Sequence, residues 1–125
     1  MNRSRLGWIL LAHWHESEAR AIATLLEAEG WQVRIVWWRE MIKVRELHED
    51  IPRAVAVSLR RLPTHGSDLG KFLQSFHWSR GIPLIFFDGS DQTITDVRGH
   101  VPGAHFCAFD QLSAMLENTD HWRQP

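Results

Sequence analysis

The segment Ala54–Gly66 reads Ala-Val-Ala-Val-Ser-Leu-Arg-Arg-Leu-Pro-Thr-His-Gly, and it decides the fold expected for this 125-residue chain. Its first half is a short apolar run with β-branched residues, which is typical of a strand buried on both faces of a parallel sheet. Its second half is polar, so we expect a loop that leaves the carboxyl end of a strand over about residues 53–59. In open parallel sheets, ligands bind at the carboxyl ends of the strands. The segment therefore predicts a central strand and the edge at which a site would be built.

Four other segments have the composition of strands, two before this one and two after it. They are residues 7–12, 31–36, 82–87 and 105–109. Apolar residues at helical spacing follow each strand and predict five helices. These helices are expected over about residues 16–29, 40–50, 67–76, 91–100 and 110–116. Ser67 or Asp68 is expected to cap the third helix.

Because strand and helix alternate five times with short connections, each crossover should be right-handed and all strands parallel. The fold class expected is α/β, a three-layer sandwich with a five-stranded parallel sheet in the flavodoxin-like order 2-1-3-4-5. The length fits one domain over residues 1–125, with a core over about residues 7–117 and a frayed tail over residues 118–125.

The composition is that of an ordinary globular protein, with 44% hydrophobic and 23% charged residues. A formal net charge of −1 gives no overall field to attract nucleic acid or an anionic membrane, so we expect neither partner. No apolar run approaches the roughly 20 residues of a membrane-spanning helix. Cys107 is the one cysteine, falls in a buried strand pattern and is expected to be inert, and a cytoplasmic location is expected.

Seven side chains are expected on one rim at the carboxyl ends of the strands, and they form the candidate ligand-binding set. They are His13, His15, Ser58, Arg60, Arg61, His65 and Asp88. Arg60 and Arg61 suit a phosphate or a carboxylate, because a guanidinium can bind either with two parallel hydrogen bonds. The opposing interpretation is structural: Arg60 and Asp88 form an ion pair between two loops, and Ser58 makes a local hydrogen bond.

Two catalytic or metal-binding interpretations of these residues are weaker. His13 and His15 with His65 could hold zinc or copper, but their spacing is not a strong ligand motif. Ser58, a histidine and Asp88 could form a hydrolytic triad, but no Gly-x-Ser-x-Gly elbow surrounds the serine. The chain also has no phosphate-binding loop and no Gly-x-Gly-x-x-Gly after its first strand. We therefore expect no metal, no cofactor and no enzymatic activity.

Seven tryptophans and no tyrosine are unusual in a chain of this length. Trp14, Trp37, Trp38 and Trp78 fall at or near predicted loops, and tryptophan is enriched at protein interfaces. Neighbouring residues at a strand end point to opposite sides, so one of Trp37 and Trp38 is expected to be exposed as an anchor for a partner protein. Ordinary packing against Met41 or a helix is the opposing interpretation.

Three short motifs resemble those of response-regulator receiver domains, over about residues 7–116. They are Leu62-Pro63 with Gly66 after the third strand, Ile82-Pro83 at the start of the fourth, and Gly103-Ala104 before the fifth. The form Ser58-Leu-Arg-Arg-Leu-Pro-Thr-His-Gly66, with Asp88-Gly89 after the fourth strand, also resembles a little-described set of bacterial receiver-like proteins of unassigned function.

The resemblance implies a phosphoacceptor aspartate at the end of the third strand, where Ser58 and Leu59 stand. It implies an acidic pair that holds magnesium after the first strand, where this chain has His13-Trp14. A threonine or serine should end the fourth strand and a lysine the fifth, where Asp88 and Phe109-Asp110 stand.

Without a carboxylate nucleophile and carboxylate ligands for the metal, aspartyl phosphorylation has no chemical basis. We therefore expect a non-catalytic pseudo-receiver, a signalling or scaffold domain that binds another protein or a second copy of itself. A small anionic ligand at Arg60 and Arg61 is the alternative.

Overall fold

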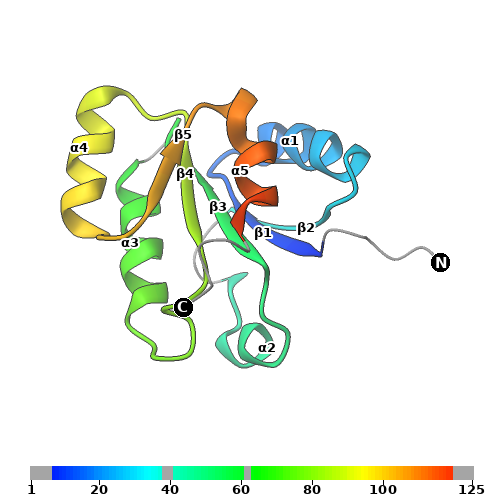
Figure 1. The fold of residues 1–125 in the computed structure, drawn as a ribbon, viewed down its shortest axis with the longest axis horizontal. Helices are drawn as coiled ribbons and strands as arrows, with labels where there is room; N and C mark the ends of the chain where they lie inside the picture. Colours follow the sequence, from blue (N-terminus) through cyan, green and yellow to red (C-terminus); the bar gives the residue numbers. More distant parts are fainter. Residues whose placement is uncertain (1–6, 38–40, 61–62, 120–125) are drawn as a thin grey trace.

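The computed structural model describes residues 7–37, 41–60 and 63–119, and these form one five-stranded parallel sheet with helices on both faces (Figure 1). The strands are β1 (Trp8–Ala12), β2 (Gln32–Val36), β3 (Ala54–Ser58), β4 (Leu84–Phe87) and β5 (His105–Cys107). The helices are α1 (Glu16–Ala28), α2 (Val44–Glu49), α3 (Pro63–Gln74), α4 (Asp91–His100) and α5 (Leu112–Glu117). The strand order is β2-β1-β3-β4-β5 with every pair parallel, which confirms the predicted fold class.

Alternation along the buried strands separates the core into two halves. In β1, Trp8, Leu10 and Ala12 face the cluster that packs under α2, α3 and α4, whereas Ile9 and Leu11 face α1 and α5. Every residue of β1 and β3 is buried, as expected for central strands covered on both faces. The register pairs Ala12 with Val57 and Ser58 with Phe87, so the carboxyl ends of β1, β3 and β4 meet at one edge.

Helix α3 begins at Pro63, four residues before the predicted cap at Ser67, so the expected polar loop is shorter than the sequence indicated. Proline suits the first turn of a helix because its missing N–H has no intrahelical acceptor there. Gly66 therefore lies inside α3, where it permits close packing. A Cβ at this position would be 3.0 Å from Val57 Cγ1 and 3.2 Å from Leu59 Cδ2.

Three other predicted boundaries were wrong. Helix α2 begins at Val44 rather than residue 40, because Met41 and Ile42 pack against the core from an irregular segment; Glu40 lies outside the described residues. Strand β5 ends at Cys107, and a 3₁₀ turn covers Phe109–Gln111. In the predicted tail, Thr119 is fully buried and its hydroxyl accepts a hydrogen bond from Arg53 Nε at 3.1 Å.

Candidate functional site

The carboxyl ends of β1, β3 and β4 bring together the positions that the sequence analysis singled out. His13, directly after β1, is only 1% exposed, and its backbone N–H donates to the Val36 carbonyl at 3.1 Å. Its Nδ1 accepts from the backbone N–H of His15 at 3.2 Å, so the proton of the neutral ring is on Nε2. That Nε2 lies 3.4 Å from Glu18 Oε1 in the first turn of α1. The His13 ring is thus held on both nitrogens within the β1–α1 connection.

Ser58 and Leu59, at the end of β3, are both buried. Ser58 is fully buried, and its Oγ accepts a hydrogen bond from the backbone N–H of Arg60 at 3.2 Å. Leu59 is 3% exposed and belongs to the core cluster under α2, α3 and α4. A Cβ at Gly89 would be 2.8 Å from Leu59 Cδ1, so the leucine lies directly against the backbone that follows β4. The local hydrogen bond expected for Ser58 is therefore present, and Leu59 fills the space beside it.

The carboxylate of Asp88, which follows β4, binds the backbone just after β5. Its Oδ1 accepts from the backbone N–H of Phe109 at 2.9 Å, and its own N–H donates to the Cys107 carbonyl at 3.1 Å. Asp88 has a φ of 62°, in the left-handed region that aspartate tolerates better than most residues. Among the described residues no ion pair joins Asp88 to Arg60, so the predicted pairing of the two loops is not observed.

The remaining candidate ligand residues are exposed where the structure describes them. His15 is exposed and its Nδ1 lies 3.2 Å from Ser17 Oγ, whereas His65 is exposed in the first turn of α3. Arg60 is exposed, and Arg61 lies outside the described residues. In the part of the chain that the structure describes, no three histidine, cysteine, aspartate or glutamate side chains lie close enough together to hold a metal ion.

The described tryptophans of the proposed partner surface are half-buried, and each ring packs against a neighbouring side chain. The Trp14 ring meets the His65 ring edge-on at 5.4 Å, and Trp78 stacks on His48 with centroids 4.6 Å apart. Trp37 lies under the guanidinium of Arg20, with 5.7 Å between Arg20 Cζ and the ring centroid. Each ring therefore has a structural contact and an exposed part. Trp38 lies outside the described residues.

The thiol of Cys107 is protected from ionisation. Burial, with added repulsion from the carboxylates of Asp88 and Asp110, raises the pKa of Cys107 to about 11. A thiol that stays protonated near neutral pH is a poor nucleophile. This direction agrees with the expectation that Cys107 is inert.

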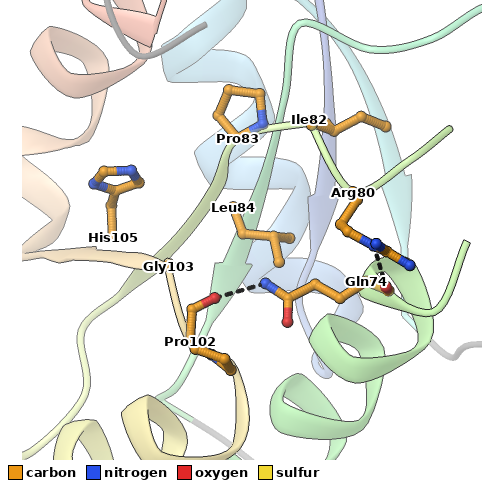
Figure 2. A pocket seen from close by; sticks show the side chains of 9 residues that line it. Gln74, Arg80, Ile82, Pro83, Leu84, Pro102, Gly103 and His105 are labelled. Carbon is orange, nitrogen blue, oxygen red and sulfur yellow. Dashed lines mark hydrogen bonds between the residues drawn. The ribbon is translucent and has the colours of Figure 1, made fainter. Parts of the chain in front are cut away.

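Sequence reasoning missed two groups of residues because their members are far apart in the chain. The Trp8 Nε1–H donates to Asp50 Oδ1 at 3.0 Å, Arg34 pairs with Asp50 at 2.8 Å, and the Arg34 Cζ lies 3.9 Å from the Trp8 ring centroid. The second group lines a cavity at the opposite edge of the sheet, at the amino ends of β4 and β5, and includes Arg80 (Figure 2). No motif marks the first group in the sequence. The motifs Ile82-Pro83 and Gly103-Ala104 supply part of the second group, but they indicated only the fold.

Comparisons with known proteins place this geometry in a structural class. No protein-family model matches the chain, and no curated protein sequence matches it. Solved structures do match. The receiver domain of the sensor histidine kinase PA1611 from Pseudomonas aeruginosa PAO1 has a TM-score of 0.73 and 17% identity, covering 90% of this chain and 95% of that domain. The fold is that of a receiver domain.

Other structures with this fold agree. A response regulator signal receiver domain from Bermanella marisrubri has a TM-score of 0.72 and 18% identity, covering 90% of this chain and 97% of that one. Full-length FixJ from B. japonicum has a TM-score of 0.74 and 15% identity, covering 98% of this chain and 61% of that protein. The described helices include none long and apolar enough to cross a membrane.

Proposed function

We propose that the chain is a non-catalytic, receiver-like signalling or scaffold domain that acts by binding another protein and is not phosphorylated on an aspartate. The observation that supports this most is the state of the strand carboxyl ends. Ser58 and Leu59 are buried there, His13 is held by His15 and Glu18, and Asp88 is bonded to the backbone that follows β5. These side chains stabilise the connections of the fold, and Ser58 and Leu59 stand at the end of β3 in place of a carboxylate nucleophile.

The chemistry of phosphoryl transfer supports the same proposal. An aspartyl phosphate requires a carboxylate nucleophile, and a magnesium ion that assists the transfer requires oxygen ligands. The PA1611 receiver domain was crystallised with a magnesium ion coordinated in its active site cleft. At the corresponding edge of this chain, imidazole, hydroxyl and isobutyl groups stand at His13, Ser58 and Leu59. Of these groups, none is the hard anionic ligand that magnesium prefers.

Half-exposed tryptophans support the proposal that the chain binds a protein. Trp37 and Trp78 each bury one side against Arg20 or His48 and keep part of the ring exposed. Aromatic residues anchored in this way lose little conformational entropy on binding. We therefore propose another protein, or a second copy of this chain, as the partner.

The proposal is tested by intact-mass spectrometry after incubation with acetyl phosphate and magnesium. The expected result is an unchanged mass, while the PA1611 receiver domain, incubated alongside, gains one phosphoryl group. A stoichiometric phosphoryl adduct that maps to an aspartate of this chain would overturn the proposal.

A small anionic ligand at Arg60 and Arg61 is the second candidate function. Arg60 is exposed, and within the described residues its side chain makes no hydrogen bond or ion pair. A ligand that binds the folded state alone raises the melting temperature. A thermal-shift screen with phosphates, nucleotides and carboxylates should therefore show a shift that is lost in the Arg60→Ala/Arg61→Ala variant. A shift that survives in this variant would exclude the arginine rim.

A further inference from the structure

The cavity at the amino ends of β4 and β5 lies at the edge of the sheet opposite to the receiver-like site. Its volume is about 540 Å³, which is within the usual range of small-molecule sites. Two connections of the fold contribute to it: the one that leads from the end of α3 into β4, and the one between α4 and β5 (Figure 2). The residues that line it are Gln74, Arg80, Gly81, Ile82, Pro83, Leu84, Pro102, Gly103 and His105.

The charge of this lining has one sign. Arg80 is a permanent cation, and among the described residues no aspartate or glutamate lines the cavity. A second hollow, between α3 and α4, provides a contrast because Asp68 and Asp96 line it together with Lys71. Charges of both signs line that hollow, whereas Arg80 is the charged side chain in the described lining of this cavity. This cavity therefore favours an anion.

Arg80 is held in place but keeps donors available. Its Nε donates to the backbone carbonyl of Gln74 at 3.3 Å, and the Gln74 side chain in turn donates to the Pro102 carbonyl at 2.9 Å (Figure 2). The two terminal nitrogens of Arg80 make no hydrogen bond or ion pair with any described residue. A guanidinium fixed through Nε loses less conformational entropy when its terminal nitrogens bind a carboxylate.

The floor of the cavity is apolar and rigid. Ile82 and Leu84 are 6% and 4% exposed and belong to the core, and Pro83 is buried between them. The His105 ring lies on the far side of Pro83 and Leu84 from Arg80 in the view of Figure 2, and burial lowers its pKa below the usual value. A neutral imidazole there adds no second cation near Arg80. The cavity thus offers one cationic end and an apolar surface.

We propose that this cavity binds a small organic carboxylate with an apolar body, with the carboxylate on the terminal nitrogens of Arg80 and the body over Pro83 and Leu84. This site is independent of the receiver-like edge, because the two lie at opposite ends of the strands. It is also separate from Arg60, which follows the carboxyl end of β3.

The test uses benzoate, with benzamide as the neutral molecule of the same shape and inorganic phosphate as an anion without an apolar body. The amide resonances of Gly81 and Gly103, which both line the cavity, report binding during an NMR titration of the full chain. Benzoate should shift both resonances saturably, and benzamide and phosphate should leave them unmoved. Equal shifts with benzamide or with phosphate would overturn the proposed ligand class, and no shift with benzoate would overturn the site.

Two matched variants test whether Arg80 holds the carboxylate. Arg80→Gln should weaken benzoate binding by about tenfold or more, because a hydrogen-bonded charge pair contributes that much. Arg45→Gln removes the same charge from an exposed position on α2, no residue of which lines the cavity, and should leave the affinity unchanged. The proposal is wrong if Arg80→Gln retains the affinity or if Arg45→Gln loses it. A melting temperature for Arg80→Gln equal to that of the parent chain verifies that the variant is folded.

Discussion

The two edges of the sheet differ in how their polar side chains are used. At the carboxyl edge, His13, Ser58 and Asp88 are bonded to neighbouring backbone or to Glu18, and Leu59 packs against Gly89, after β4. At the amino edge, Arg80 lines an open cavity with two nitrogens that make no hydrogen bond to any described residue. The difference teaches that a fold preserves the place of a site without preserving its chemistry. Under the proposed function, the carboxyl edge has a structural role in this chain.

Leu59→Ala gives the largest effect expected at the carboxyl edge. Removing a fully packed leucine leaves a cavity and should lower the free energy of unfolding by about 2–5 kcal/mol. Urea denaturation monitored by tryptophan fluorescence measures this change. Leu25→Ala is the matched control, because Leu25 on α1 is 54% exposed and its truncation should change stability by only about 0.5 kcal/mol. Equal losses in the two variants would contradict a structural role for this edge.

Gly89→Ala should have the next largest effect. The added methyl group would lie 2.8 Å from Leu59 Cδ1 and 3.2 Å from Ile94 Cγ1, so it should cost about 1–3 kcal/mol of stability through overpacking. Gly81→Ala is the control at the other edge, because a Cβ there meets nothing within 4 Å. In the Leu59→Ala background the cost of Gly89→Ala should fall, because the obstructing side chain is absent. Additive losses would show that the two residues are not in contact.

Asp88→Asn tests a smaller, electrostatic effect at the same edge. The amide oxygen of asparagine can still accept from the Phe109 N–H, but the charge that helps to raise the pKa of Cys107 is gone. The pKa should therefore fall from about 11, and more thiolate should be present at any given alkaline pH. The rate of alkylation by iodoacetamide against pH measures the shift. Asp91→Asn, in the first turn of α4, is the control and should leave the profile unmoved.

The strands could be predicted from the sequence because buried parallel strands are continuous apolar runs. Ala54–Ser58 and Trp8–Ala12 were predicted to within one or two residues for this reason. The beginning of α3 was not, since Pro63 and Gly66 usually signal a loop. Gly66 lies within the helix, and the close approach of Val57 and Leu59 leaves little room for a Cβ at this position. Tertiary contacts of this kind are not visible in local sequence.

The candidate site, like the fold, could be predicted from the sequence only in part. The residue types at the strand ends could be predicted from the order of the elements, and so could the local bond of Ser58. Their partners could not, because Glu18 reaches His13 from α1 and the Phe109 N–H reaches Asp88 from 21 residues away. The cavity around Arg80 was missed for a related reason. Its lining comes from two connections that are distant in sequence, and the motifs within them indicated the fold rather than a cavity.

A magnesium titration tests the central difference between the two edges most directly. The backbone amide resonances of His13, Ser58 and Asp88 report on the carboxyl edge, and those of Gly81 and Gly103 report on the amino edge in the same NMR spectra. The account predicts no saturable shift at His13, Ser58 or Asp88 as magnesium is added, since the described side chains there offer no set of free carboxylates. A saturable shift confined to these three residues would contradict it.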